Sequence, residues 1–447
     1  MQQQTSVFSP AYGLVPSTHR IRVCDAIMGS GKTTSAIRLM NAHPEQHFVY
    51  VTEILDEGDR IMQACPALKF RRPGYDTRRG KKRVRMNKSD HVVQLLEAGE
   101  NVVTTHKLFT MFDDRVFEAV RERGYIMIID EEPVVIENCS FGRADFASLE
   151  QGGYIRRHKD GTFDVLRDKF DGQLNTLLQK CRTHRTMCCS DKDAPGQMWT
   201  LRPDVFEAFK EIYIMTYLYQ GSTLQYYMRV HDIPYGYIYI GRDTEQEACF
   251  VPACADRYLP EYVGRLHKLI HICEDEELNQ LGDDQFAYSA KWLTTNTRNN
   301  TKYGKMMKSH LRRFFTELTA DIPGEQRMWS TLADCESYLS RNGWKAAFVT
   351  YNRRAVNCHM HRRSLAYLMN VFMHPSLKIF LSRHNVTPDE DTYALAIFIQ
   401  WIWRSAIRNG EEIWLYVPSK RMRTLLKAWI TKCEDEYRQS YDAESVA

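Results

Sequence analysis

The sequence predicts an α/β fold with two domains, each built on a mainly parallel sheet. Short β-branched or aromatic runs alternate with stretches of helical character, an order typical of parallel sheets covered on both faces. The chain has 447 residues, of which 43% are hydrophobic, and one core rarely serves so long a chain. The apolar runs also fall into two sets that meet near residue 235.

The two sets define the expected domains. The first domain spans 21–235, and its strands are expected at 48–52, 101–105, 125–130 and 212–218. The second domain spans 236–447, with strands expected at 235–241, 267–273, 346–352 and 412–419 and helical insertions between 275 and 345. Residues 1–20 are expected to form a flexible lead-in.

Residues 24–34, CDAIMGSGKTT, follow the first apolar run and fit a phosphate-binding loop. Gly29 and Gly31 let consecutive N–H groups face a triphosphate, Lys32 reaches the β and γ oxygens, and Thr33 can ligate Mg²⁺. A chance glycine-rich turn is the alternative, but the order of strand, loop and helix favours the phosphate loop. The sequence therefore predicts ATP binding, through Ala26, Gly29, Ser30, Gly31, Lys32, Thr33 and Thr34.

A second motif, Asp130-Glu131-Glu132-Pro133, ends the apolar run 125–130. Ligands of open parallel sheets lie at the carboxyl ends of strands, where the phosphate loop also lies. Asp130 is expected to hold Mg²⁺ together with Thr33, and Glu131 to deprotonate the attacking water. The alternative is that these carboxylates merely cap the next helix.

Residues 69–88 carry ten Lys or Arg and one Asp. We expect a loop here, because the segment also contains Pro73, Gly74 and Gly80. It is either a clamp on a phosphate backbone, through Arg78, Arg79, Lys81, Lys82 and Arg83, or a solvated loop.

Composition and cysteine spacing restrict the cellular location, the metal sites and the partners that we expect for this protein. The twelve cysteines have no regular spacing, and the chain shows neither a signal peptide nor a long apolar span, so we expect a cytoplasmic protein with reduced thiols and no membrane association. Cys181, His184, Cys188 and Cys189 could hold zinc, but idle thiols are favoured because no second ligand pair stands nearby. A net charge of +4 permits a nucleic-acid partner without requiring one.

These motifs together resemble those of superfamily 2 helicases, with residues 130–133 similar to a DEAD/DEAH box and a compact, phage-type length. The resemblance implies two RecA-like domains. It also implies nucleic-acid contacts at Thr52, Thr105 and His106, and at Arg353 and Arg354 after the run 346–352. Thr216 would couple hydrolysis to strand binding.

A further match lies at 400–408, QWIWRSAIR, within an expected helix from about 392 to 408. Gln400, Arg404 and Arg408 are spaced by four and would share one helix face. In the family pattern such arginines reach the γ-phosphate across a cleft between the domains. Trp403 replaces the expected Gly and Arg408 comes one residue late, and an ion pair with Glu411 or Glu412 is the alternative.

The resulting hypothesis is an ATP- and Mg²⁺-dependent helicase or translocase acting on DNA rather than RNA, in phage replication or recombination and with the proteins of that process as possible partners. A module that closes on nucleic acid or protein without unwinding remains the alternative. A small-molecule kinase would leave the second domain unexplained.

Overall fold

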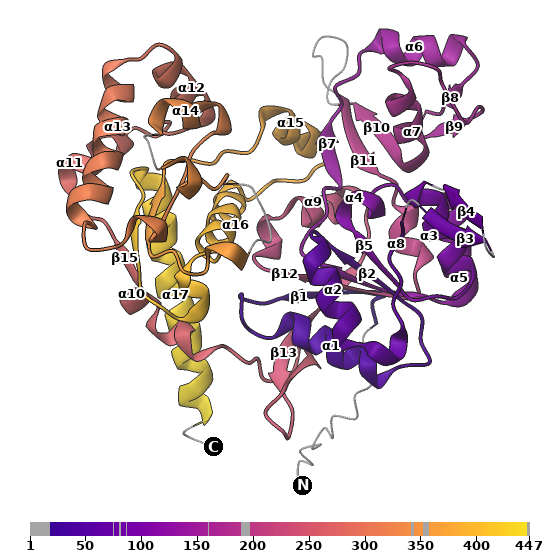
Figure 1. Ribbon diagram of the computed structural model, residues 1–447, viewed down its shortest axis with the longest axis horizontal. Coiled ribbons are helices and arrows are strands. Elements are labelled where there is room, and N and C mark those ends of the chain that lie inside the picture. Colours follow the sequence, from indigo (N-terminus) through magenta and orange to yellow (C-terminus); the bar gives the residue numbers. More distant parts are fainter. Residues whose placement is uncertain are drawn as a thin grey trace. The chain divides into compact units, whose positions relative to one another are not determined.

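Two parallel sheets organise the chain, one in each of two units (Figure 1). The computed structural model describes residues 18–74, 76–79, 82–85, 87–159, 161–188, 197–340, 344–351 and 357–444. The first unit runs to Tyr258 and also takes His374–Pro388, and the second consists of Leu259–Met373 and the residues from Asp389 onward. The mixed α/β class with parallel sheets is therefore confirmed.

The sheet of the first unit has seven strands in the order β14-β13-β1-β12-β6-β2-β5. All neighbouring strands are parallel except β14, which is antiparallel to β13. The strands are β1 (Ile21–Asp25), β2 (Phe48–Thr52), β5 (Val102–Thr105), β6 (Ile126–Asp130), β12 (Glu211–Thr216), β13 (Tyr235–Arg242) and β14 (Ala248–Pro252). The expected boundary at 235 is too early, because β13, which we assigned to the second domain, pairs with β1.

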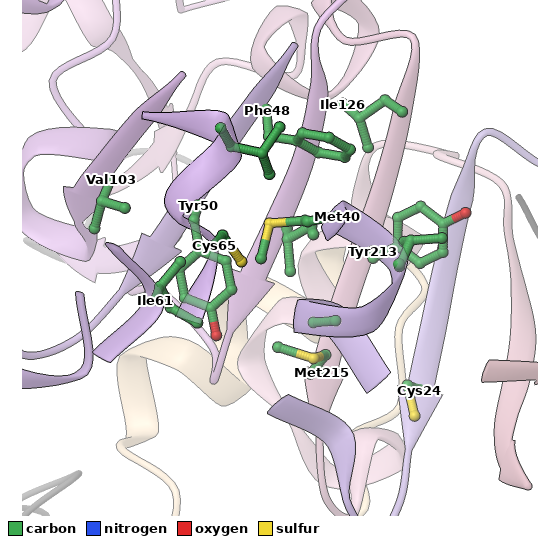
Figure 2. Close-up of a cluster of buried hydrophobic side chains, with 14 of the residues drawn as sticks. Cys24, Met40, Phe48, Tyr50, Ile61, Cys65, Val103, Ile126, Tyr213 and Met215 are labelled. Atoms are coloured by element: carbon green, nitrogen blue, oxygen red, sulfur yellow. The ribbon is translucent and has the colours of Figure 1, made fainter. Parts of the chain in front are cut away.

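Alternation of side chains explains why this sheet is buried on both faces. Ile126 and Ile128 of β6 join a cluster with Met40, from the helix after the phosphate loop, and with Ile61 (Figure 2). The intervening Met127 and other residues of β6 are equally buried on the opposite face. The strands thus read as continuous apolar runs, as a doubly covered sheet requires. The helices of this unit outside the insertion described below are α1 (Lys32–Ala42), α2 (Leu55–Ala64), α3 (Lys88–Glu97), α4 (His106–Phe109), α5 (Asp114–Arg123), α8 (Asp204–Ala208), α9 (Thr223–Val230) and α15 (Pro375–Arg383).

An insertion with its own core lies between β6 and β12 in the sequence (Figure 1). Its antiparallel sheet has the order β10-β11-β7, and Phe146, Leu149, Leu177 and Trp199 are among the residues of a separate hydrophobic cluster. The elements are β7 (Ile136–Asn138), α6 (Arg143–Gln151), β8 (Ile155–Arg157), β9 (Phe163–Val165), α7 (Asn175–Thr183), β10 (His184–Cys188) and β11 (Gln197–Leu201). Sequence periodicity did not reveal this insertion as a separate layer.

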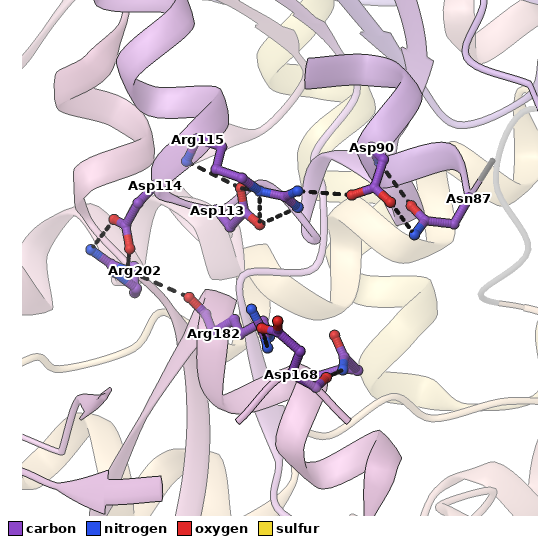
Figure 3. A network of polar contacts seen from close by, with 9 residues as sticks. Asn87, Asp90, Asp113, Asp114, Arg115, Asp168, Arg182 and Arg202 are labelled. Atoms are coloured by element: carbon purple, nitrogen blue, oxygen red, sulfur yellow. Dashed lines mark hydrogen bonds and ion pairs between the residues drawn. The ribbon is translucent and has the colours of Figure 1, made fainter. Parts of the chain in front are cut away.

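Ion pairs join α5 to α3 and to the chain that leaves the insertion (Figure 3). Arg115 of α5 binds Asp90 of α3 at 2.8 Å, and Arg202, directly after β11, binds Asp114 of α5 at 2.9 Å. Such partly exposed pairs contribute little stability each, but together they fix the orientation of α5 against the chain leaving β11.

The second unit is built on a four-stranded parallel sheet in the order β15-β18-β17-β16. Its strands are β15 (Ile270–Ile272), β16 (Arg327–Ser330), β17 (Ser364–Tyr367) and β18 (Ile413–Tyr416). Its helices are α10 (Leu266–Leu269), α11 (Glu276–Asn279), α12 (Ala290–Arg298), α13 (Lys302–Arg313), α14 (Glu336–Leu339), α16 (Glu390–Ile402) and α17 (Lys420–Glu444). Helices do fill 275–345, as expected, although β16 also lies there.

Two expected strands of the second unit differ from the structure. Within 346–352, residues up to Ala347 form a 3₁₀ turn and Phe348 makes a single bridge to Trp329, so no strand forms among the described residues there. Residues 267–273 are divided between α10 and the short β15. Among the described residues, no helix combines the length and apolar character that crossing a membrane requires.

Candidate nucleotide-binding site

The phosphate loop joins the carboxyl end of β1 to the first turn of α1. Gly29 and Gly31 have φ angles of 77° and 101°, in the region that favours glycine. Gly31 is the residue that caps α1, and a Cβ there would lie 2.5 Å from Cβ of Ala248. Both glycines are therefore required by the backbone, and their N–H groups begin the helix where an anion is favoured.

Lys32 lies over this loop rather than extending into solvent. Its side chain is buried, and the ammonium group donates hydrogen bonds to the carbonyl oxygens of Ala26 and, at 3.3 Å, Ile27. The neighbouring Ser30 is buried as well, and its hydroxyl has no hydrogen-bond partner among the described residues. Thr33 and Thr34 follow in the first turn of α1 and are half-buried. The loop thus contains a cation and several hydrogen-bond donors, and a bound oxyanion would accept hydrogen bonds from them.

The acidic motif lies at the same edge of the sheet, two strands from the loop. The paired residues Cys24, Met215 and Asp130 form a row across β1, β12 and β6. Neighbouring strands are about 4.8 Å apart, so Asp130 lies about 10 Å from the start of the phosphate loop. The sequence prediction that both motifs meet at the carboxyl edge agrees with this register.

The surroundings of Asp130 disfavour its charged form. Tyr50 donates a hydrogen bond of 2.9 Å to Oδ2 of Asp130. Burial, together with the charge of Glu131, raises the pKa of Asp130 to about 7, while the Tyr50 hydrogen bond and Lys32 act in the opposite direction. Lys32, at the phosphate loop, thus favours the charged form of Asp130. A divalent cation bound here would likewise favour the charged form of Asp130 and lower its pKa.

Glu131 has the most unusual geometry in the site. Its φ angle is 63°, which is uncommon for a residue other than glycine, and its N–H donates to the Met215 carbonyl at 3.0 Å. Its Oε2 atom is buried without a hydrogen-bond partner among the described residues. Strained backbone and an unsatisfied carboxylate oxygen are both costly, and proteins retain them mainly at functional positions.

Thr216 connects the two motifs. Its side chain is fully buried and its hydroxyl donates to Oε1 of Glu132 at 2.9 Å. Its backbone carbonyl accepts the N–H of Ala26 at 3.0 Å, at the start of the phosphate loop. One residue at the end of β12 therefore links the loop after β1 to the loop after β6.

Two further residues position the site, and neither was predicted from the sequence. The Asp25 carboxylate accepts N–H bonds from Leu218 at 2.8 Å and from Tyr219 at 3.0 Å, which fixes the turn after β12. Tyr50 is the donor to Asp130 already described. The available signals were a polar residue at the start of the phosphate loop and a tyrosine within the apolar run 48–52.

The residues expected to contact nucleic acid lie at the ends of β2 and β5, with partly different roles. Thr52 and Thr105 line a cavity of about 60 Å³ that Arg72 and Lys88 also line. Thr105 caps α4 by accepting from the N–H of Leu108. His106 Nε2 donates to the Asp130 carbonyl at 2.9 Å, so this side chain is directed at the acidic motif.

The basic segment is not the loop that we expected. Its backbone forms the antiparallel hairpin of β3 (Asp76–Arg79) and β4 (Lys82–Arg85), which holds Arg78, Arg79, Lys82 and Arg83. A run of basic residues has no apolar alternation from which such a hairpin could be predicted. Lys81 lies outside the described residues, as do Arg353 and Arg354.

The expected arginine helix also differs. Helix α16 ends at Ile402, and a separate 3₁₀ turn, Ala406–Asn409, contains Arg408, so Gln400, Arg404 and Arg408 do not share one helix face. The helix ends because Ser405 takes an extended conformation after Trp403, which packs on Trp429. Arg404 is buried and donates to the Thr350 carbonyl at 3.3 Å, whereas Arg408 is exposed.

Comparison with known proteins places the chain in a family. The protein described as "SPbeta prophage-derived uncharacterized protein YonV", from Bacillus subtilis (strain 168), is 31% identical over 418 residues, which cover 92% of this chain and 98% of the relative. The chain belongs to the YonV family.

A family model described as "YonV C-terminal Rossmann-like domain" matches residues 264–430. This YonV domain contains all four strands of the second parallel sheet. Among solved structures, the one titled "Structure of S. tokodaii Xpd4" is similar with a TM-score of 0.39 and 10% identity, covering 92% of this chain and 94% of that chain.

The side chains at the carboxyl edge fit a magnesium nucleotide. Mg²⁺ in phosphate sites usually takes one or two protein ligands, and Thr33 and Asp130 supply that number. Within the described part of the chain, no group of three or more His, Cys, Asp or Glu side chains is placed to hold a metal ion.

Proposed function

We propose that this chain is an ATP-dependent nucleic-acid helicase or translocase that acts on DNA, in phage replication or recombination. The observation that carries the proposal is the Glu131 carboxylate, with a buried, unpartnered Oε2 on strained backbone beside Asp130. Such an oxygen is satisfied when a water donates a hydrogen bond to it. In γ-phosphate hydrolysis the attacking water donates that hydrogen bond to the catalytic base and then gives up its proton to it.

Each further residue has a role in nucleotide hydrolysis. Lys32 would exchange the Ala26 and Ile27 carbonyls for phosphate oxygens, and Ser30 and the N–H groups before α1 would bind the same phosphates. Thr33 and Asp130 would hold Mg²⁺, which supplies charge neutralisation when bound. Glu131 would orient the attacking water and accept its proton.

Coupling to a nucleic acid is supported by the neighbours of Asp130. His106 joins the end of β5 to the Asp130 carbonyl, and Thr216 joins the phosphate loop to Glu132. A change in the ligand at Asp130 would therefore act on the cavity at Thr52 and Thr105, where Arg72 and Lys88 are suited to a phosphate backbone.

The phage setting is supported by the prophage-derived relative. The preference for DNA rests on that setting alone, since no described contact selects for or against a 2′-hydroxyl. Arg78, Arg79, Lys81, Lys82, Arg83, Arg353 and Arg354 remain proposed backbone contacts, and Arg404 or Arg408 the proposed γ-phosphate contact.

The decisive experiment is ATP hydrolysis by the purified chain with and without single-stranded DNA or RNA. We expect stimulation by DNA, and loss of hydrolysis in Lys32→Ala and Glu131→Gln. Glu118→Gln, which neutralises an exposed carboxylate on α5, is the matched control and should leave hydrolysis unchanged. Glu131→Gln should still bind ATP, because the substitution removes the base and leaves the phosphate loop intact.

Strand displacement from a fluorescently labelled duplex then separates the two motor hypotheses. Displacement that requires ATP supports a helicase, and stimulated hydrolysis without displacement supports the non-unwinding module. Hydrolysis that neither polymer changes would contradict a nucleic-acid motor of either kind.

A further inference from the structure

We propose that helices α12 and α13 of the second unit carry a surface for single-stranded nucleic acid, distinct from the residues named above. The surface consists of Lys291, Arg298, Lys302, Lys305 and Tyr303, and we call it the α12–α13 surface. The inference rests on the proposed function, since it supplies that function with a further contact for the strand.

The charge of this segment is entirely of one sign. Residues 285–316 contain seven Lys or Arg and no Asp or Glu. The whole chain carries 60 basic and 56 acidic residues, so acidic side chains are almost as frequent overall as basic ones, whereas these 32 residues contain none. A one-sided charge distribution of this kind attracts a polyanion.

The folded helices place these charges on their outer faces. Lys291 and Arg298 are exposed and seven residues apart, two turns along α12. On α13, Lys302, Lys305 and Arg312 are exposed along one stripe. Helices α12 and α13 lie next to each other (Figure 1), and each presents basic residues to solvent.

The four cations of the α12–α13 surface have no carboxylate partners within the described residues, where none of them forms an ion pair. Arg313, at the end of α13, differs from these four cations because it is paired with carboxylates. Arg313 binds Asp275 at 2.9 Å and Glu277 at 2.6 Å. Arg115 and Arg202 of the first unit are likewise paired with carboxylates (Figure 3). The α12–α13 surface is therefore a place where basic side chains gather without internal neutralisation.

Packing of the two helices does not need these side chains. Gly304 lies so close to α12 that a Cβ would be 2.5 Å from the Asn296 carbonyl oxygen. Leu293, Met307 and Leu311 are buried on the inner faces. The basic residues can therefore be replaced without removing what holds the helices together.

An exposed aromatic ring completes the surface. Tyr303 is 51% exposed, and its ring centroid lies 6.2 Å from that of Trp292 at an interplanar angle of 36°. The Trp292 ring in turn lies 5.0 Å from the buried Tyr288. Tyr303 is thus a supported outer ring beside Lys302, and a base can stack on such a ring while its phosphates meet the lysines. Duplex DNA offers no open base faces, so the aromatic ring favours a single strand.

The test compares two variants with equal changes in charge. The first, Lys291→Gln/Arg298→Gln/Lys302→Gln/Lys305→Gln, neutralises the α12–α13 surface. The matched control, Lys420→Gln/Lys427→Gln/Lys432→Gln/Arg438→Gln, removes four positive charges from α17, where each is paired with a carboxylate. Binding of a fluorescein-labelled oligothymidylate is measured by anisotropy at several salt concentrations.

We expect the first variant to bind about 10- to 100-fold more weakly. Its salt slope should fall by about 3, because each phosphate that a cation neutralises on a single strand contributes about 0.7 to the slope. The control should bind as the wild type does. Tyr303→Ala should weaken binding about tenfold and Tyr303→Phe should not, because stacking requires the ring and not its hydroxyl. Unfolding curves and ATP hydrolysis without DNA should be unchanged in all of these variants.

Failure of this inference and failure of the proposed function give different results. Wild-type protein that binds no oligonucleotide contradicts the proposed function. Wild-type binding that the first variant and Tyr303→Ala retain overturns the α12–α13 surface alone. Equal loss of binding to polyglutamate and to oligothymidylate in the first variant, with no effect of Tyr303→Ala, would indicate an acidic protein partner and also overturn the inference. Photocrosslinking of a 5-iodouracil oligonucleotide to wild-type Tyr303 gives a readout that does not depend on the variants folding.

Discussion

Thr216 donates its hydroxyl hydrogen to Oε1 of Glu132 across 2.9 Å, and both side chains are buried. The same threonine accepts the Ala26 N–H through its carbonyl. The hydrogen bond lies between the ends of β12 and β6, so it fixes the acidic loop relative to the phosphate loop. Removing the hydroxyl would leave a buried carboxylate oxygen without this donor, and the free energy of unfolding would fall by the cost of that unsatisfied oxygen.

Thr216→Val should therefore destabilise the protein. The valine has nearly the same shape, and loss of a hydrogen bond to a charged group costs about 1.5–3 kcal/mol in the free energy of unfolding. Urea unfolding followed by circular dichroism measures this change. Thr216→Ser retains the donor and should lose much less stability; equal losses in both variants would show that the methyl group, not the hydroxyl, is what matters.

His184, which is buried, and His231, which is half-buried, predict a loss of stability at acid pH. Burial and the nearby charge of Lys180 lower the pKa of His184 to about 3. Burial and the charge of Arg185, which donates to its ring, lower the pKa of His231 to about 3. The unfolded chain binds these protons near pH 6.5, so it binds more protons than the folded chain between about pH 6.5 and pH 3. The free energy of unfolding should then fall as the pH is lowered through this window.

At pH 5 the two histidines together should cost about 4 kcal/mol relative to pH 7.5, from about 1.4 kcal/mol per pH unit and group. Urea unfolding at pH 5, 6 and 7.5 measures this dependence. His231→Asn should reduce the slope, and His267→Asn, which replaces a largely exposed histidine, should leave the contribution of His231 intact. A slope that His231→Asn does not change would show that His231 is protonated in the folded chain.

The parts of the fold that could be predicted from the sequence are those that local patterning determines. Strands β2, β5, β6 and β12 are apolar, largely β-branched runs, and the glycines of the phosphate loop have a fixed spacing. Strand β17, SLAY, has four residues without a β-branched side chain, and it is a strand because it pairs with β16 and β18. The run 346–352 shows the opposite case, since Phe348 packs against Trp329 without extending the sheet.

The candidate site shows the same division. The position of Glu131 after an apolar strand could be predicted, but its positive φ angle could not, because neighbouring loops impose it. The arginine spacing suggested one continuous helix, whereas packing of Trp403 against Trp429 and Tyr262 ends that helix early. Tertiary contacts, which a single sequence does not display, decided both cases.

The two arginines of that region should differ in their effects on stability. Arg404 is buried and donates to the Thr350 carbonyl, so Arg404→Gln should lower the free energy of unfolding by about 1–3 kcal/mol. Arg408 is exposed, and Arg408→Gln should change it by less than about 0.5 kcal/mol. Thermal unfolding of the two variants side by side measures the difference. An Arg404→Gln protein of unchanged stability that has lost ATP hydrolysis would instead assign Arg404 to the nucleotide.

Gly31→Ala should abolish nucleotide binding for two separable reasons. The φ angle of 101° disfavours any side chain, and the added Cβ would lie 2.5 Å from Cβ of Ala248. Gly410→Ala is the matched control, because Gly410 has a φ angle of 75° with nothing within 4 Å of an added Cβ, so only the backbone cost of about 1–2 kcal/mol remains. Titration calorimetry with Mg²⁺ and ATP measures binding, and urea unfolding measures stability.

Gly31→Ala/Ala248→Gly should recover the packing part of the stability loss but not nucleotide affinity, since the N–H groups of the loop still require the left-handed glycine conformation. Full recovery of affinity in the double variant would show that the contact with Ala248, rather than the backbone of the loop, governs the site.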